Sequence, residues 1–213
     1  MIKIENTVVY GWEAAIRGMR NPMNSWAKSD SVFCEGAALL GPNDHGLMMR
    51  LAKGGPVHAT YRRMITVTVD VEAPLYWWKE ADRYRHGKEQ NSCSTMHKIH
   101  DKEFTLDDFS HEHLLNDPNY GLGALIITID ALNYNRALYL HSQKQDKSLW
   151  WNMIQLLPSS YNQRRTVQFS YETLVAIYKW RKNHKLDEWR EFCTWIESLP
   201  YSEIITGGEG NEG

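Results

Sequence analysis

The sequence lacks the glycine-rich motifs by which many proteins bind phosphate. No GxGxxG motif stands between a predicted strand and a predicted helix, and GxxxxGK followed by Ser or Thr does not occur. A nucleotide or flavin would therefore not be bound by a Rossmann turn or a P-loop. The GxSxG turn of α/β-hydrolases is missing as well. Phosphate groups would have to be neutralised by side-chain cations, for which the candidates are Arg83, Arg85, Lys88 and Arg181.

Cysteine is scarce, and long hydrophobic runs are missing. The three cysteines, Cys34, Cys93 and Cys193, are widely spaced and form no CxxC pair, which excludes a disulfide framework and predicts a cytoplasmic location. Cys93 lies in a polar segment, where it is either a nucleophile or a plain small residue. No stretch approaches the roughly 18 apolar residues that span a membrane, and the N-terminus has no apolar signal core. We therefore predict neither export nor membrane insertion.

Charge of one sign is not in excess either. A formal net charge of −2 argues against a general binder of nucleic acid or membrane surfaces, so that any basic site must be local. The length predicts a single domain over residues 1–205 and a disordered Gly-rich tail at 206–213. Nine Trp and eleven Tyr are many for this length, and they either fill a core and a subunit interface or stack on a planar ligand.

The stretch 64–94 carries the clearest pattern. Apolar and polar residues alternate over Ile65–Val71, which predicts a strand with one buried face. Pro74 ends the strand and begins a helix, because proline cannot donate to a sheet but suits the first helical turn. The helix delivers Arg83 and Arg85 into a polar segment, His86–Ser94, which we expect to be a loop. Arginine grips phosphate with paired hydrogen bonds, so this stretch predicts an anion site.

Other segments predict a mixed α/β chain. Ile2–Tyr10 is typical of a short strand. Helices are predicted at Gly46–Lys53, Leu125–His141, Leu149–Leu157, Ser170–Asn183 and Asp187–Leu199.

Histidine pairs raise the question of a metal. His97 and His100 can share a helix face, and His111 and His113 can share a strand face. Neither pair has a carboxylate or cysteine at a diagnostic spacing, so we predict no metal site. A metal-dependent nucleotide hydrolase that uses the four histidines is the remoter alternative.

Two sets of motifs resemble the flavin-dependent thymidylate synthases. Ala73-Pro74, Arg83-x-Arg85 and Asn91-x-x-Ser94 are similar to the family's Ala-Pro strand end, Arg-His-Arg and Asn-Glu-x-Ser. Leu157-Pro158, then Leu174 and Arg181, repeat the spacing of a second family motif. The segment 51–56 is similar to the one before the family's strand, and the resemblance covers roughly residues 45–195.

The resemblance implies a fold, a reaction and roles for single residues. The fold would be α/β (α+β), with a central, mostly antiparallel sheet and flanking helices. The protein would be a divergent, phage- or prophage-type member that forms a homotetramer with sites between subunits. It would use FAD, NADPH and methylenetetrahydrofolate to transfer a one-carbon unit reductively to dUMP or a similar pyrimidine nucleotide. Ser94 and Arg181 would be catalytic, with Arg181 stabilising charge on the ring. The flavin would be bound by Arg83, Arg85 and Asn91, and the nucleotide by Arg83, Ser94, His97 and Arg181.

The chain departs from the family pattern at several of these motifs. One extra residue lies between Arg85 and Asn91, and two phosphate-directed arginines are replaced. Each lost arginine removes hydrogen bonds that contribute about 1.5–3 kcal/mol, for which Arg62, Arg63 and His97 are the candidate replacements. The substituted positions are Arg63-Met64 for Glu-His, Tyr84 for His, Ser92 for Glu, Met96 and Ile154 for Arg, Ser170 for Asn and Glu172 for Arg. A non-catalytic protein that holds or sequesters a nucleotide on the same scaffold is therefore the main alternative to an active enzyme.

Overall fold

The computed structural model describes residues 1–34, 37–116 and 120–207. The strands are β1 (Lys3–Tyr10), β2 (Val32–Cys34), β3 (Ala37–Leu39), β4 (Thr66–Pro74), β5 (Lys88–Ser92) and β6 (Asn162–Ser170). The α-helices are α1 (Trp12–Arg20), α2 (Pro42–Lys53), α3 (Leu75–Ala81), α4 (Thr95–Lys98), α5 (Gly121–His141), α6 (Lys147–Leu156), α7 (Tyr171–Arg181), α8 (Asp187–Glu197) and α9 (Glu203–Thr206). Residues 208–213 of the predicted Gly-rich tail lie outside the described residues.

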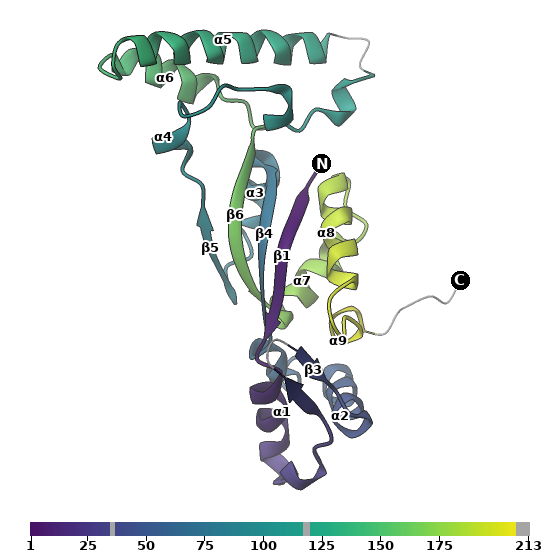
Figure 1. Cartoon of the computed structure of the whole chain (residues 1–213). Helices are drawn as coiled ribbons and strands as arrows, with labels where there is room; N and C mark the ends of the chain where they lie inside the picture. The colour runs from purple at the N-terminus through teal and green to yellow at the C-terminus, as the bar shows by residue number, and fades with distance from the viewer. Residues whose placement is uncertain (35–36, 117–119, 208–213) are drawn as a thin grey trace. The chain divides into compact units, whose positions relative to one another are not determined.

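The main sheet has four strands in the order β1-β4-β6-β5 (Figure 1). It is antiparallel and flanked by helices, which confirms the predicted fold class. A separate antiparallel pair, β2 and β3, has Val32 opposite Leu39. No helix in the described ranges is long and apolar enough to cross a membrane.

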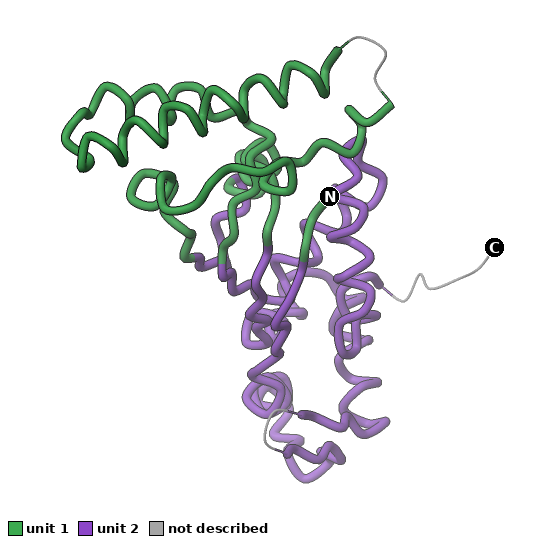
Figure 2. Tube along the Cα trace, turned by 45° about the horizontal axis from the view of Figure 1, so that its top comes forward, with its two compact units in different colours: residues 1–3, 72–82, 91–165 green, residues 4–71, 83–90, 166–213 purple. Residues whose placement is uncertain are grey.

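The chain divides by internal contacts into two compact units (Figure 2). Unit 1 comprises residues 1–3, 72–82 and 91–165, and unit 2 comprises residues 4–71, 83–90 and 166–213. Each strand of the main sheet has residues in both units, so the division does not test the single domain predicted for residues 1–205. That assignment stays a prediction.

In unit 2, the apolar face of β4 is buried as its alternation predicts. Val67, Val69 and Val71 are fully buried. Helices α7 and α8 contact each other, and α8 adds Phe192, whose ring lies 5.7 Å from that of Phe169 on β6. Trp195 on α8 also donates from its indole nitrogen to the hydroxyl of Thr7 on β1 at 3.0 Å. This packing fixes α7, the helix that carries Arg181.

Unit 1 is built around the pair of helices α5 and α6. Leu125, Ile129 and Leu132 of α5 are buried with Met153 of α6, and the same core includes Ile99, Phe104 and Phe109. Another part of the surface of α5 is apolar but exposed: Ile127 is 71% exposed and Tyr134 is 67% exposed. A helix that is apolar on more than one face normally meets a second partner.

The structure differs from the sequence analysis at one predicted loop and adds strands that were not predicted. The segment expected to be a loop, His86–Ser94, contains strand β5, which is an edge strand of polar residues and therefore has no hydrophobic alternation to reveal it. Strand β6 was not predicted, because Arg164, Arg165 and Thr166 interrupt its apolar pattern. The β2–β3 pair was missed because three-residue strands are too short for a period to be seen.

Candidate functional site

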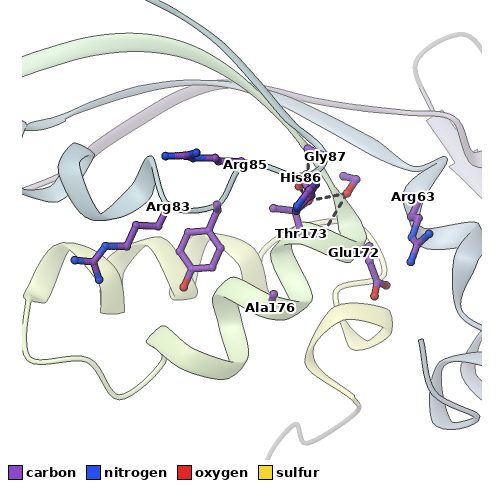
Figure 3. A pocket seen from close by; sticks show the side chains of 10 residues that line it. Arg63, Arg83, Arg85, His86, Gly87, Glu172, Thr173 and Ala176 are labelled. Carbon is purple, nitrogen blue, oxygen red and sulfur yellow. Dashed lines mark hydrogen bonds between the residues drawn. The ribbon is translucent and has the colours of Figure 1, made fainter. Parts of the chain in front are cut away.

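The segment that carries the predicted arginines, Arg83–Gly87, follows α3 and lies against α7 in unit 2. Its C-terminal end is bound to the first turn of α7 (Figure 3). The amide of Ser170 donates to the carbonyl of Gly87 at 2.8 Å, and the hydroxyl of Thr173 donates to the carbonyl of His86 at 2.7 Å. Ser170 also caps α7, because its hydroxyl accepts from the amide of Thr173 at 3.2 Å. The helix start and the arginine segment therefore share one network.

Glycine is needed at position 87 for two reasons. Its φ of +65° lies in the left-handed region that side chains rarely adopt. A Cβ there would lie 2.5 Å from the hydroxyl oxygen of Ser170 and 2.6 Å from that of Thr173. The close approach of the segment to α7 thus depends on the missing side chain.

The other end of the segment is fastened through Tyr84. Arg181, the last residue of α7, donates from Nε to the hydroxyl of Tyr84 at 3.0 Å. Its guanidinium carbon lies 4.7 Å from the ring centre of Trp189 and 5.7 Å from that of Tyr84. Arginine is attracted to the faces of such rings. Arg181 is thereby fixed between a residue of α8 and the arginine segment.

Arg83 and Arg85, on either side of Tyr84, are exposed. Among the residues that the structure describes, neither guanidinium has an ion-pair partner or a hydrogen-bond acceptor. Figure 3 shows both well separated from Arg63 and Glu172, with Gly87 and Thr173 between the two sets. Hydrogen bonds to α7 fix the backbone of this segment, whereas its two guanidinium groups have no partner in the described residues. Such an arrangement suits an anionic ligand.

These residues line a pocket of about 630 Å³ within unit 2, which we call the arginine pocket. That volume is in the range of sites for small molecules and cofactors. Its charged lining residues are Arg63, Arg83, Arg85 and Glu172. Glu172 is paired with the buried Arg62, whose Nε lies 2.9 Å from its Oε2, so the pocket keeps an excess of positive charge.

Some of the predicted site residues line the arginine pocket, and others lie elsewhere in the chain. Arg83 and Arg85 line it, whereas Arg181 is outside its described lining and donates to Tyr84, which is a lining residue. Tyr84 and Glu172 are lining residues that motif matching treated only as substitutions. Arg63, a candidate replacement cation, lines the pocket, but Arg62 does not, because its guanidinium is bound to Glu172 and to the carbonyl of Ile204 at 3.1 Å.

The remaining predicted site residues, Asn91, Ser94 and His97, belong to unit 1. Asn91 is exposed on β5, and the hydroxyl of Ser94 accepts from the amide of His97 at 3.2 Å at the start of α4. Ser94 lines a second pocket, of about 440 Å³, together with the exposed thiol of Cys93. In the described part of the chain, neither Asn91 nor His97 lines this pocket or the arginine pocket.

The four histidines lie in unit 1, and His100 and His111 illustrate their structural contacts. His100 is buried against the ring of Tyr139, and this burial, together with the charge of Lys144, lowers its pKa below the ordinary value. The Nδ1 of His111 lies 2.8 Å from the carbonyl of Phe109. Over residues 1–34, 37–116 and 120–207, no three His, Cys, Asp or Glu side chains are grouped so that they could hold a metal ion.

Comparison with solved structures identifies the fold. Thymidylate synthase X (ThyX) from Helicobacter pylori, in a structure with FAD and dUMP, aligns over 98% of both chains with a TM-score of 0.68 and 17% identity. A second structure of flavin-dependent ThyX from that organism, also with FAD and dUMP, has a TM-score of 0.66 and 16% identity, over 98% of this chain and 100% of the other. The UMP/dUMP methylase PolB from Streptomyces cacaoi, bound with 5-Br dUMP, has a TM-score of 0.64 and 13% identity, over 97% and 94% of the two chains. No protein-family model and no curated protein matches the sequence. The chain therefore has the ThyX fold, as the sequence resemblance implied.

Proposed function

We propose that this chain binds a phosphorylated flavin and a pyrimidine nucleotide and transfers a one-carbon unit reductively to the pyrimidine ring. The observation that carries the proposal is the arginine pocket, where Arg63, Arg83 and Arg85 have no ion-pair partner among the described residues, on a fold whose solved relatives were bound to FAD and dUMP. Because proteins of one fold can have different functions, the proposal depends on the pocket more than on the fold.

The charge distribution indicates where phosphate would bind. A phosphate at Arg83 and Arg85 gains charge-assisted hydrogen bonds from two guanidiniums that have no competing partner in the described residues. Each such bond contributes about 1.5–3 kcal/mol. Phosphate near Glu172 would instead face a carboxylate, so this part of the pocket suits the uncharged part of a ligand.

The residues present fit the phosphate groups of FAD. Arg83 and Arg85 would hold them, and the volume of about 630 Å³ can contain a large part of such a ligand. When bound, the flavin would supply hydride transfer, with NADPH as the hydride source and methylenetetrahydrofolate as the one-carbon donor. Arg181 would stabilise negative charge on the pyrimidine ring, and Ser94 would bind the nucleotide phosphate; these remain the proposed catalytic residues.

We further propose that the protein assembles as a homo-oligomer, a tetramer by resemblance to the family. The exposed apolar side chains of α5, Ile126, Ile127, Tyr134 and Leu138, form a surface of the kind that a second copy covers. The three free cysteines suit the reducing cytoplasm in which we place the protein.

The alternative function is that of a non-catalytic nucleotide-binding protein. Two observations favour it: Glu172 brings a carboxylate into the pocket, and Arg181 is bound to Tyr84 instead of lining the pocket itself. Such a protein would keep the phosphate-binding arginines without the flavin or the reaction.

The two functions differ in colour and in turnover. The first predicts that purified protein shows the visible absorption band of oxidised flavin and methylates dUMP when NADPH and methylenetetrahydrofolate are supplied. The alternative predicts a colourless protein that binds dUMP without converting it. The Arg83→Ala/Arg85→Ala variant should lose binding in either case. A wild-type protein that binds neither FAD nor dUMP would contradict both.

A further inference from the structure

Another pocket in unit 2, of about 460 Å³, lies along one face of α1 and shares no lining residue with the arginine pocket. Its volume is within the range of sites for small molecules. The lining comes from α1 and from the segment that follows this helix, and it includes Glu13, Arg17, Arg20, Asn21 and Trp26. We call it the α1 pocket.

Hydrogen bonds fix the segment that follows α1. Arg20 donates from Nη1 to the carbonyl of Ser25 and from Nη2 to that of Lys28, both at 3.1 Å. Between these two residues in the chain stands Trp26, whose indole nitrogen donates to Oδ1 of Asn21 at 2.8 Å although the residue is 49% exposed. An exposed tryptophan that is fixed in this way presents an aromatic surface on which a planar ring can stack.

Glu13 and Arg17 supply the charges of the α1 pocket that a ligand can reach. They stand one turn apart on α1, at a spacing at which glutamate and arginine commonly pair. Within the described residues they form no ion pair with each other, and neither side chain has another partner. Arg20, by contrast, is bound to Asp44 and to two backbone carbonyls. One helix face therefore offers a group that only accepts hydrogen bonds beside a group that only donates them.

These two groups select the edge of a ring. A carboxylate accepts two parallel hydrogen bonds from neighbouring N–H groups, and a guanidinium donates two to neighbouring acceptors. Guanine has both edges: a ring N–H beside an amino group, and a carbonyl oxygen beside a ring nitrogen, which is the acceptor pair that arginine contacts in DNA. Adenine has no carbonyl and no ring N–H beside its amino group, and uracil has no amino group. Neither of them satisfies both side chains.

We propose that the α1 pocket binds a ring with the hydrogen-bonding edges of guanine. The ring stacks on Trp26, Glu13 accepts from its N–H and amino groups, and Arg17 donates to its carbonyl oxygen and ring nitrogen. Pterins carry the same 2-amino-4-oxo arrangement, so the ligand is a guanine nucleoside or a pterin. The inference does not depend on the proposed function, because it uses a different pocket and no phosphate.

Compounds without phosphate test the α1 pocket apart from the arginine pocket. Inosine differs from guanosine only in lacking the amino group, and adenosine lacks the carbonyl and the ring N–H. Equilibrium dialysis of wild type with guanosine, inosine, adenosine and pterin measures the four dissociation constants. We expect guanosine to bind at least about tenfold more tightly than inosine or adenosine, the size of one hydrogen bond to a charged group. Pterin that binds as tightly as guanosine, or more tightly, identifies a pterin, and weaker pterin identifies a nucleoside.

Two variants assign the contacts, and a third is their control. Glu13→Gln should reduce the preference for guanosine over inosine to within about threefold, because an amide accepts on one side only. Arg17→Met should weaken guanosine and inosine alike by about tenfold, since both carry the carbonyl, and leave their ratio unchanged. Arg50→Met removes an exposed arginine of α2 that does not line the α1 pocket, and it should change neither affinity. The thermal midpoint of each variant checks that it is folded.

Several outcomes would overturn the inference. It is wrong if wild type binds neither guanosine nor pterin, if guanosine and inosine bind equally, or if the preference for guanosine survives Glu13→Gln. It is also wrong if Arg83→Ala/Arg85→Ala weakens guanosine, because the ligand would then lie in the arginine pocket. Failure of the proposed function has a different sign, a wild type that binds neither FAD nor dUMP.

Discussion

Unit 2 contains two kinds of arginine, and their surroundings differ. Arg20 is buried and donates from all three nitrogens: Nε to Asp44 at 2.6 Å, Nη1 to the carbonyl of Ser25 at 3.1 Å and Nη2 to that of Lys28 at 3.1 Å. Arg83 and Arg85 are exposed in a pocket, and within the described residues they donate to nothing. The first kind ties loops to a helix, whereas the second is available to an anion from outside the chain.

The comparison shows that an arginine without a partner indicates a binding site only when its backbone is fixed by hydrogen bonds to the rest of the fold. Many surface arginines lack partners and bind nothing specific. Here Gly87 and His86 are bonded to the first turn of α7, and Tyr84 is bonded to its last residue. The flanking arginines are thus presented from a fixed segment, which lowers the entropy lost when a ligand binds.

The largest effect is expected at the buried arginine. Arg20→Ala leaves the carboxylate of Asp44 buried without its cation, which should reduce the free energy of unfolding by about 3–5 kcal/mol. Urea denaturation measures this, and dUMP binding below the transition should be retained, because Arg20 does not line the arginine pocket. A loss below about 1 kcal/mol would show that the two kinds of arginine do not differ as described.

The next effect is expected in binding. Arg83→Ala and Arg85→Ala should each weaken a phosphorylated nucleotide by about 10- to 100-fold, because each removes charge-assisted hydrogen bonds worth about 1.5–3 kcal/mol. The free energy of unfolding should change by no more than about 0.5 kcal/mol, since neither side chain has a partner in the described residues. A large loss of stability without a loss of affinity would assign both residues to the structural kind.

The anchoring of the segment can be tested at its glycine. Gly87→Ala adds both a strained φ and a clash with Ser170 and Thr173. Gly55 is the matched control, because its φ is +93° but a Cβ there would meet nothing within 4 Å. Both variants should lose about 1–2 kcal/mol from the strained backbone, and Gly87→Ala should lose about 1 kcal/mol more. Only Gly87→Ala should also weaken dUMP, and equal effects on binding would contradict the anchoring.

The smallest effect is the dependence of stability on pH through Asp44. Burial raises the pKa of Asp44, but hydrogen bonds from Ser31, Ser29 and Arg20 outweigh it and hold the pKa below its ordinary value. The group therefore stabilises the folded chain fully above the unfolded pKa, and this contribution is lost as the pH falls through the folded pKa. Unfolding measured from neutral to acid pH should give a shallower decrease for Asp44→Asn than for wild type. Parallel curves would show that Asp44 carries no linked proton.

The features that could be predicted from the sequence are those that depend on residues close together in the chain. The alternation of Ile65–Val71 and the helices Leu125–His141 and Asp187–Leu199 are local patterns, and each corresponds to a described element with bounds shifted by a few residues. Strand β5 depends on its pairing at the sheet edge, and its polar residues carry no local signal of it.

The same limit applies to the site. The spacing of the motifs predicted Arg83 and Arg85 as site residues, and both line one pocket. Spacing could not show that Tyr84, which lines that pocket, accepts from Arg181, because the contact joins residues 97 positions apart. Nor could it show that Arg62 is bound to Glu172, which distinguishes it from its neighbour Arg63. In the sequence, Tyr84 is only a tyrosine in place of the family's histidine between two arginines. Its contact with Arg181 becomes known only from the structure.

The central claim is that the arginine pocket receives the phosphate of a nucleotide. Its most direct test is the phosphate-dependent part of the affinity, measured by calorimetry with dUMP against deoxyuridine and with FAD against riboflavin. We expect wild type to prefer the phosphorylated member of at least one pair by about 100-fold or more, and Arg83→Ala/Arg85→Ala to lose most of that preference. A preference that survives in the double variant, or a wild type that has none, would contradict the claim.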